Sequence, residues 1–256
     1  MPQQSHIKEF SAGFLSALKK QLLEAKNSLK GPVVAAFDAD GTLWDTDMGE
    51  RFFLYQIKNS KLPHLPPDPW KHYHELKAVD KVAAYYWLAQ INSGQTLTQV
   101  RKWAADCVDA ETIPIFQSQK NLIQFLKENN VEVYIVTASV KWAVEPAALH
   151  VGVDFDHVLG MHTEVTRDVV GKEPIPPATY RAGKLDAILK ASGGVSPFFC
   201  SGNTPGDFEL MKGATHLRLA VRTWSSQSSI EDNHLRQDED ALHKEAQALG
   251  WLTHAF

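Results

Sequence analysis

Aspartates gather directly after an apolar run near the start of the chain, in VVAAFDADGTLWDTD at residues 33–47. Asp38 and Asp40 lie two residues apart, and Gly41 after them allows a sharp turn before Asp45. Carboxylates this close repel one another unless a divalent cation or a basic side chain neutralises them. The pattern therefore predicts a site for a metal or for paired-carboxylate chemistry. A solvated turn capped by aspartates is the alternative interpretation.

Short apolar runs along the chain predict the strands that hold these carboxylates. They are VVAAF, VEVYIV, PFFC and HLRLAV, at residues 33–37, 131–136, 197–200 and 216–221. Helical patterns lie between the second and third runs, from Trp142 to His150 and from Lys184 onward. Strands that alternate with helices predict an α/β fold with a parallel sheet between helices. Ligands of such sheets bind beyond the carboxyl ends of the strands, where Asp38 and Asp40 would lie.

Further polar side chains accompany the later apolar runs. VYIVT ends on Thr137, YRAGKLDAI places Lys184 at the start of a helix, and SGNTPGDFELM supplies Asn203 and Asp207. Taken singly, Thr137 is typical of a strand-end hydroxyl and Lys184 of a surface lysine. Together with the aspartate turn, and in this order, they form a specific pattern.

These four pieces resemble, in order, the motifs of the haloacid dehalogenase-like (HAD) superfamily phosphatases. FDADGT is similar to the first motif, DxDGT or DxDST, and the pieces around Thr137, Lys184 and Asp207 are similar to the other three. The resemblance covers about residues 33–220. It implies a HAD-like Rossmannoid core with a helical cap inserted between the first and second motifs. The cap and the segments ADGTLW, PPATYRAGK and GNTPGD look like the phosphoserine phosphatase-like and phosphocholine phosphatase-like branch.

The resemblance implies a chemical role for each catalytic position. Asp38 would attack the phosphorus of a phosphomonoester and form an aspartyl-phosphate. Asp40 would protonate the leaving alcohol as a general acid and then activate water as a general base. Thr137 would donate a hydrogen bond to a phosphoryl oxygen, and Lys184 would hold a positive charge near it. The helix start favours Lys184 over two competing residues of that neighbourhood, which are Lys172 and Thr179.

The same resemblance implies a Mg²⁺ cofactor. Its ligands would be the Asp38 carboxylate, the Asp40 backbone carbonyl and the Asp207 carboxylate, with Asn203 at the start of the fourth motif. Many relatives carry Asp where this chain has Asn203. An amide can ligate through its oxygen but removes one negative charge, so we expect a lower metal affinity. The dehalogenase branch is excluded because it uses no metal and would leave Asp40 and Asp207 without a role.

The stretch between the first two motifs contains helical patterns and no apolar strand. Its helices are expected in RFFLYQI, VAAYYWLAQI and VRKWAADCV, with a loop marked by Pro63, Pro66, Pro67 and Pro69. We therefore expect a helical cap at residues 48–111 and an α/β core formed by residues 1–47 and 112–256. A cap of this superfamily closes over the site, excludes water and selects the substrate, which favours a small phosphorylated metabolite.

Trp44, Asp47 and Ala138 are the predicted substrate-binding residues. Trp44 follows the aspartate turn, Ala138 follows Thr137, and Asp47 lies where phosphoserine phosphatases place an acidic residue that meets the substrate amine. A carboxylate beside aromatic faces suits an ammonium group. We therefore expect a cationic phosphomonoester such as phosphocholine, phosphoethanolamine or phosphoserine. Capping of the first cap helix is the alternative role of Asp47, and most aromatic residues of the cap are expected to be core.

Composition narrows the classes of partner. The chain has 256 residues, a formal net charge of −4 and two distant cysteines, Cys107 and Cys200. Its charges form no basic stripe, so we expect no nucleic-acid partner, and its cysteines indicate neither a disulfide framework nor a zinc site. Because no long apolar stretch occurs, we expect a soluble, cytoplasmic protein without a membrane partner. The oligomeric state is left open.

Three further segments have predicted structures. Helical spacing of apolar residues near the N-terminus predicts an amphipathic helix that packs on the core; these residues are Phe10, Phe14, Leu18, Leu22 and Leu29. Residues 222–240 are polar and are expected to form a surface loop before a final helix. The remaining segment has three histidines without a metal-binding spacing, which indicates a polar loop; they are His64, His72 and His74.

Hydrolysis of a small phosphomonoester is the function that these observations favour most. One alternative is a phosphotransferase or mutase of the same superfamily, in which a second hydroxyl takes the place of water. Another is a non-catalytic phosphometabolite-binding protein, in which Asn203 would be a sign of decay. The presence of Asp38, Asp40 and Asp207 favours an enzyme.

Overall fold

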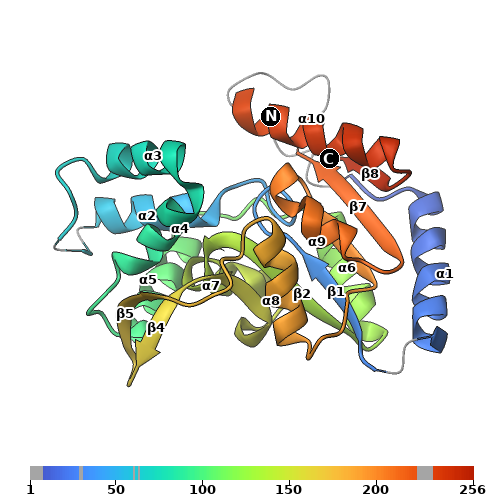
Figure 1. Ribbon diagram of the computed structural model, residues 1–256, viewed down its shortest axis with the longest axis horizontal. Helices are drawn as coiled ribbons and strands as arrows, with labels where there is room; N and C mark the ends of the chain where they lie inside the picture. Colours follow the sequence, from blue (N-terminus) through green and yellow to red (C-terminus); the bar gives the residue numbers. More distant parts are fainter. Residues whose placement is uncertain (1–7, 29–30, 60, 63, 224–232) are drawn as a thin grey trace.

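A single six-stranded parallel sheet forms the centre of the protein (Figure 1). The computed structural model describes residues 8–28, 31–59, 61–62, 64–223 and 233–256. The strands lie in the order β3 (Val158–Met161), β2 (Val131–Val140), β1 (Val33–Phe37), β6 (Phe199–Gly202), β7 (Leu217–Arg222) and β8 (Leu252–Ala255). All four predicted strands are present, and the α/β fold with a parallel sheet is confirmed. The two edge strands, β3 and β8, were not predicted.

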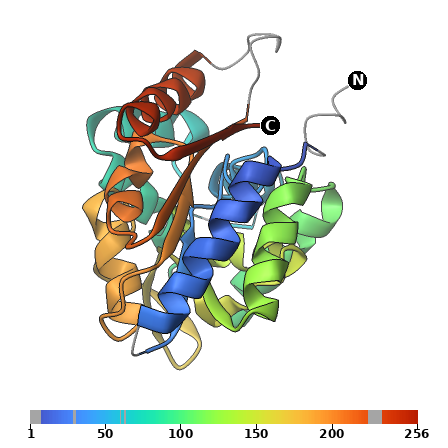
Figure 2. The same cartoon turned by 90° about the vertical axis from the view of Figure 1, so that its right-hand side faces the viewer.

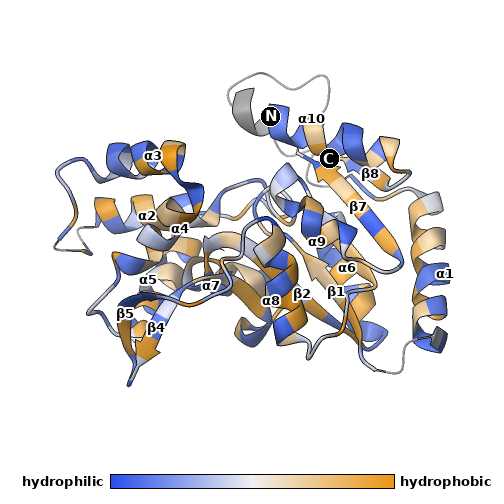
Figure 3. Ribbon diagram, in the orientation of Figure 1, coloured by the Kyte–Doolittle hydropathy of each residue, from blue (hydrophilic) through white to orange (hydrophobic). Residues whose placement is uncertain are grey.

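The apolar composition of β1 follows from burial on both faces of the sheet. Val33, Ala35 and Phe37 belong to one hydrophobic cluster, whereas Val34 and Ala36 belong to another. Because successive strand residues point to opposite faces, a strand between two helical layers must be apolar throughout. Figure 2 shows α1 and α6 on one face, and Figure 3 shows that the apolar residues concentrate in the sheet. The first cluster is covered by α1 (Ala12–Ser28), α6 (Gln117–Glu128) and α7 (Lys141–His150), the second by α8 (Ala182–Ala191), α9 (Phe208–Lys212) and α10 (Asn233–Ala248).

The N-terminal helix α1 packs on the core as its spacing predicted. Phe10, Phe14, Leu18 and Leu22 are all buried in the first cluster. Leu29 lies outside the described residues. None of the helices in the described part of the chain is long and apolar enough to cross a membrane.

Five helices of the described chain lie between β1 and β2, and the first four of them are on the left of Figure 1. A capping side chain begins each of these four, because the first amides of a helix have no internal partner. Pro69 opens the second helix instead of lying in a loop, since proline lacks the amide that a first position leaves unpaired. The division of the chain at residues 48 and 111 stays a prediction. The helices and caps are α2 (Met48–Lys58, Asp47), α3 (Pro69–Val79, Asp68), α4 (Lys81–Gln90, Asp80) and α5 (Leu97–Ala110, Thr96).

A β-hairpin that the sequence analysis did not predict extends toward these helices. Its strands β4 (Thr163–Thr166) and β5 (Val169–Pro174) flank Arg167 and Asp168, which have positive φ angles of 51° and 66°. Such angles are typical of a tight two-residue hairpin turn. The hairpin contacts the cap helices through the Tyr86 hydroxyl, which donates to the Ile175 carbonyl at 3.0 Å. Polar residues in both strands hid the pattern.

The prediction of a surface loop at residues 222–240 is wrong at its C-terminal end. Helix α10 begins at Asn233, so residues 233–240 are helical. Glu239 of this segment is fully buried, as are Leu242 and Ala246 one and two turns later. A polar sequence can form a packed helix when its buried carboxylate has hydrogen-bond partners, and composition alone does not reveal those partners. Residues 224–232 lie outside the described part of the chain.

Packing of α1 can be tested with two leucines of the same helix. Leu18 is 1% exposed and Leu23 is 62% exposed. We expect Leu18→Ala to lower the free energy of unfolding by about 3 kcal/mol, because it leaves a cavity in the core. Leu23→Ala should change it by less than about 0.5 kcal/mol. Urea unfolding followed by circular dichroism measures both, and equal effects would contradict the packing of α1 on the core.

Candidate active site

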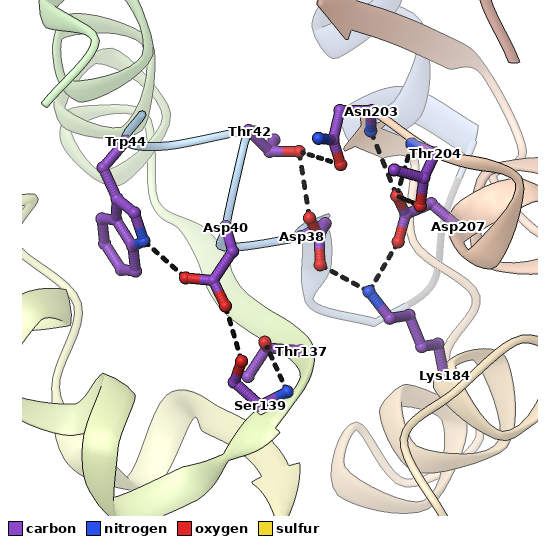
Figure 4. Close-up of polar contacts among 10 residues, drawn as sticks. All are labelled: Asp38, Asp40, Thr42, Trp44, Thr137, Ser139, Lys184, Asn203, Thr204 and Asp207. Atoms are coloured by element: carbon purple, nitrogen blue, oxygen red, sulfur yellow. Dashed lines mark hydrogen bonds and ion pairs between the residues drawn. The ribbon is translucent and has the colours of Figure 1, made fainter. Parts of the chain in front are cut away.

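Three buried charged side chains meet at the carboxyl end of β1 (Figure 4). Asp38 follows β1, Lys184 lies in the first turn of α8, and Asp207 follows β6. The Lys184 ammonium donates to Asp38 Oδ1 and to Asp207 Oδ1, each at 2.5 Å. These three residues are at most 6% exposed. Adjacent parallel strands β1 and β6 bring the carboxylates together, and the helix that packs beneath them supplies the cation.

The two carboxylates around Lys184 outnumber its positive charge. Burial raises the pKa of Asp38 to about 6, the Asp207 charge adds to this shift, and Lys184 only partly opposes it. Burial alone would lower the pKa of Lys184, but the Asp207 and Asp38 carboxylates outweigh it and raise the pKa. The ammonium is therefore permanently charged, and one negative charge remains without a full counter-charge.

Asp40 turns its carboxyl group away from this cluster. Its Oδ1 accepts from Trp44 Nε1 at 2.7 Å and from the Met48 amide at 3.0 Å, and its Oδ2 accepts from Ser139 Oγ at 2.6 Å. Burial raises the pKa of Asp40 to about 8, and the nearby Asp47 charge adds to the shift, although the three hydrogen bonds oppose it. Among the described residues no basic side chain hydrogen-bonds to Asp40, so no positive charge offsets its burial as Lys184 does for Asp38.

Trp44 does not take the substrate-binding position that the sequence analysis assigned to it. Its side chain is fully buried among core residues, and only its indole nitrogen reaches Asp40. The residue following a strand-end turn can point either into the site or back into the core, and the apolar bulk of Trp44 favours the core. Trp44 therefore orients Asp40 and leaves no ring face for a ligand.

Thr137 and Ser139 close the site on the side of β2. Thr137 is buried, and its Oγ accepts from the Ser139 amide at 3.1 Å. Ser139 was missed because the second motif needs a single hydroxyl, and TAS offers two. Its contact with Asp40 depends on the neighbouring positions of β1 and β2, which only the folded sheet provides.

The amide of Asn203 is oriented by a residue far away in sequence. Asn203 Nδ2 donates to Glu239 Oε1 at 3.1 Å, and its Oδ1 accepts from Thr42 Oγ at 3.4 Å. Glu239 Oε2 accepts from the amide and the hydroxyl of Thr223, both at 3.0 Å. Burial raises the pKa of Glu239 to about 7, and its ionised form can only accept. The ionised form therefore holds the Asn203 NH2 group toward Glu239 and leaves the Asn203 oxygen toward Thr42. No motif pointed to Glu239, because it lies in the polar segment predicted to be a loop.

A cavity of about 720 Å³ opens above these groups. Asp47 lines it and also caps α2, because its Oδ1 accepts from the Glu50 amide at 2.8 Å. The two roles considered for Asp47 are therefore compatible. Residues of the predicted core on the cavity wall include Asp38, Asp40, Asp47, Thr137, Ala138, Lys184, Asn203 and Asp207, and residues of the predicted cap include Glu50, Tyr73, Lys77 and Tyr85.

Most of the chain matches a known protein family. Residues 35–212 match the family described as haloacid dehalogenase-like hydrolase. The chain belongs to this family. The match begins in β1 and ends in α9, so it includes every element that carries a charged residue of the Lys184 cluster.

Named relatives of this HAD hydrolase include a phosphatase. The chain is 25% identical over 217 residues to a phosphorylcholine phosphatase of Pseudomonas aeruginosa, covering 69% of this chain and 62% of that protein. A Bordetella pertussis structure of unknown function has a TM-score of 0.68 at 16% identity, covering 88% of this chain and 99% of the other. A phosphoserine phosphohydrolase-like structure from Francisella tularensis has a TM-score of 0.51 at 18% identity, covering 74% and 87%. The structures share the fold, and the family match with the curated relative supports the HAD phosphatase branch.

The HAD motifs that the sequence indicated converge in space. Asp38, Asp40, Thr137 and Lys184 all line one cavity with Asp207 and Asn203. The two competitors of Lys184 do not contact the carboxylates: Lys172 is exposed on β5, and the buried Thr179 hydroxyl has no hydrogen-bond partner. Of the three candidate residues, Lys184 is therefore the one that contacts Asp38 and Asp207.

Oxygen donors suited to Mg²⁺ surround the Asp38–Asp207 pair of the hydrolase. No three His, Cys, Asp or Glu side chains within the described residues are grouped to hold a metal. The Asp40 carboxyl group turns away from Asp38 and Asp207, so the predicted contribution of Asp40 to a metal site is its backbone carbonyl. The remaining donors are the Asp38 and Asp207 carboxylates and the Asn203 amide oxygen, which are hard ligands beside an incompletely neutralised charge. The residues present fit a magnesium ion.

Gly41 permits the close approach between the aspartate turn and Asn203. Its φ angle is +76°, and an added Cβ would lie 2.0 Å from Asn203 Nδ2. Gly94 has a similar φ angle of +85° with nothing within 4 Å of an added Cβ. Gly94→Ala should therefore cost only the backbone strain, about 1 kcal/mol of unfolding free energy, whereas Gly41→Ala should cost at least about 2 kcal/mol.

Thermal or urea unfolding of the two glycine variants measures this difference. Because Gly94→Ala carries the same backbone strain, the excess destabilisation of Gly41→Ala reports the contact with Asn203. A Gly41→Ala protein as stable as Gly94→Ala would show that the Asn203 side chain moves aside freely.

Proposed function

We propose that the protein hydrolyses a small phosphomonoester through an aspartyl-phosphate intermediate, with Mg²⁺ as cofactor. The observation that carries this proposal is the contrast between two neighbouring aspartates, since Asp38 accepts from the Lys184 ammonium whereas Asp40 accepts from neutral donors. The pKa of Asp38 is about 6 and that of Asp40 about 8. At pH 7 Asp38 is therefore mostly ionised and Asp40 mostly protonated, which are the states required of a nucleophile and a general acid.

The first chemical step joins these two states. Asp38 Oδ attacks the phosphorus, the bond from phosphorus to the ester oxygen breaks, and the Asp40 proton passes to the leaving alcohol. In the second step, ionised Asp40 takes a proton from water as the water oxygen attacks the aspartyl-phosphate. Asp38 is released as a carboxylate, phosphate leaves, and Asp40 is protonated again. Ser139 holds the Asp40 carboxyl at 2.6 Å in position for both transfers.

Lys184 and Thr137 would stabilise the transferring phosphoryl group. Within the described part of the chain, the Lys184 ammonium donates to the Asp38 and Asp207 carboxylates alone, and it lies 2.5 Å from Asp38 Oδ1 of the proposed nucleophile. The Thr137 oxygen accepts a hydrogen bond from the Ser139 amide, which leaves the Thr137 hydroxyl proton available for a phosphoryl oxygen. Asp38, Asp207, Asn203 and the Asp40 carbonyl would hold Mg²⁺, which would supply positive charge to stabilise the transferring phosphoryl group.

The cavity supports a small substrate with a cationic group. Its volume of about 720 Å³ lies within the range of small-molecule sites. The carboxylates of Asp47 and Glu50 on the cap side can bind an ammonium group. We include phosphocholine, phosphoethanolamine and phosphoserine among the proposed substrates, because the curated relative is named a phosphorylcholine phosphatase.

Phosphate release from a panel of phosphomonoesters, with Mg²⁺ and with EDTA, tests this function. We expect metal-dependent turnover that Asp38→Asn lowers by at least about 10³-fold, because the nucleophile is lost. Asp45→Asn, an exposed acidic neighbour on the cavity wall, should keep most of the activity. Turnover that needs an added alcohol acceptor would indicate a transferase, and binding without turnover would indicate a phosphometabolite-binding protein.

The pH profile tests Asp40 as the general acid. Because Asp40 must be protonated, kcat/KM should fall about tenfold per pH unit above its pKa of about 8. Ser139→Ala removes a hydrogen bond that stabilises the carboxylate, so the basic limb should move to higher pH. Asp47→Asn removes a like charge that raises the pKa, so the limb should move to lower pH.

These profiles are measured with a phosphomonoester that lacks an ammonium group, so that Asp47→Asn does not remove a contact with a substrate cation. Displacement of the limb in the same direction by both variants would contradict the assignment. So would an unchanged limb in Asp40→Asn.

A further inference from the structure

The ammonium group of Lys77 lies in a site made for a cation. Its Nζ is 5.2 Å from the centre of the Tyr73 ring, 5.7 Å from the centre of the Tyr85 ring and 2.6 Å from Glu50 Oε1. Two aromatic faces and a carboxylate are the elements with which proteins bind ammonium ligands. Three different helices, α2, α3 and α4, supply these groups, so only the folded cap assembles them. We call Glu50, Tyr73 and Tyr85 the cation cage.

The cation cage belongs to the same cavity as the catalytic aspartates. All three cage residues and Lys77 line the cavity with Asp38 and Asp40. Asp47 connects the two ends, since its charge acts on Asp40 and is itself affected by Lys77. The group attached to a leaving oxygen that is protonated by Asp40 would therefore lie in the same cavity as Asp47 and the cage.

Packing holds the Tyr73 wall of the cage in place, whereas the occupant of the cage can leave. Tyr73 is 1% exposed and packs against Phe53 with ring centres 5.9 Å apart. The side chain of Lys77 is 26% exposed and lies in the last turn of α3, so its flexible chain can turn out to water. The rings stay neutral, because burial, together with the charges of Asp47 and Glu50, raises the pKa of both tyrosines.

We propose that Lys77 is a specificity-determining residue that competes with the substrate cation for the cation cage. The proposal rests on the proposed function, because it concerns the group attached to the phosphate in the same cavity. A tethered ammonium returns to the cage at no translational cost, whereas a substrate cation must find it free. The apparent affinity for a cationic substrate is therefore reduced by the fraction of molecules in which Lys77 has left.

Competition predicts a selective effect of removing the Lys77 charge. Lys77→Met keeps the length and apolar part of the side chain and removes its ammonium group. The cage then stays available for a substrate cation, while a substrate with a neutral group gains nothing. The matched pair is phosphocholine and 3,3-dimethylbutyl phosphate, which has carbon in place of the quaternary nitrogen.

Steady-state kinetics of both substrates measures the effect. We expect Lys77→Met to raise kcat/KM for phosphocholine about tenfold, through a lower KM at similar kcat. For 3,3-dimethylbutyl phosphate the change should stay below about threefold. Lys81→Met is the control, because Lys81 also lines the cavity but the ammonium over the Tyr73 and Tyr85 rings is that of Lys77. Lys81→Met should change kcat/KM for phosphocholine far less than Lys77→Met does.

Binding of choline chloride tests the competition without any turnover. In the wild-type protein, the ¹³Cε–¹Hε signal of Lys77 should be shifted upfield by the two rings. Added choline should return it toward the position of an exposed lysine. Lys77→Met should bind choline about tenfold more tightly than wild type, as measured by titration of the tryptophan fluorescence.

Three results would overturn the proposal. An equal change for phosphocholine and its neutral analogue would show a purely structural role of Lys77. A loss of phosphocholine turnover in Lys77→Met would show that Lys77 binds the substrate directly, and a Lys77 signal unmoved by choline would exclude competition. Absence of turnover with both substrates would instead refute the proposed hydrolysis, and the choline titration would still decide on the competition.

Discussion

Burial of two carboxylates beside one ammonium is the constraint on which the site depends. Asp38 and Asp207 lie at the ends of the neighbouring strands β1 and β6, and Lys184 contacts both at 2.5 Å. Without Lys184 these charges would be buried unpaired, which costs several kcal/mol. The start of α8, the parallel pairing of β1 with β6 and the turn at Gly41 all contribute to this one arrangement. The remaining excess of negative charge is what makes the site suited to a divalent cation.

Two aspartates of a single turn differ because their side chains point in opposite directions. Asp38 points toward Lys184, which partly offsets the effect of burial on its pKa. Asp40 points toward Trp44 and Ser139, which are neutral, and toward the field of Asp47. Asp38 and Asp40 are two residues apart in sequence, but their different surroundings give their carboxyl groups different pKa values. This division supports the proposed chemistry more strongly than either residue alone.

The side of the cavity lined by residues of α2, α3 and α4 would use the same balance of charges to select a substrate. Asp47 caps α2, influences Asp40 and faces the region of Lys77, so it couples the structure of the first cap helix to the chemistry below. Lys77 neutralises Glu50 between two tyrosine rings. Catalysis and selectivity would therefore share one electrostatic system, in which each cation is held by groups that a ligand can also use.

Local patterns in the sequence determined the fold class, the central strands, the amphipathic α1 and the residues that converge at the end of β1. These signals are local because side-chain period and turn chemistry depend on neighbours along the chain. The tertiary structure alone decided that Trp44 is buried behind Asp40, that Ser139 holds Asp40 and that Tyr73, Tyr85 and Glu50 enclose Lys77. It also decided that Glu239, 36 residues from Asn203, orients that amide. Such contacts depend on strand order and helix packing, which bring together side chains that share no local pattern.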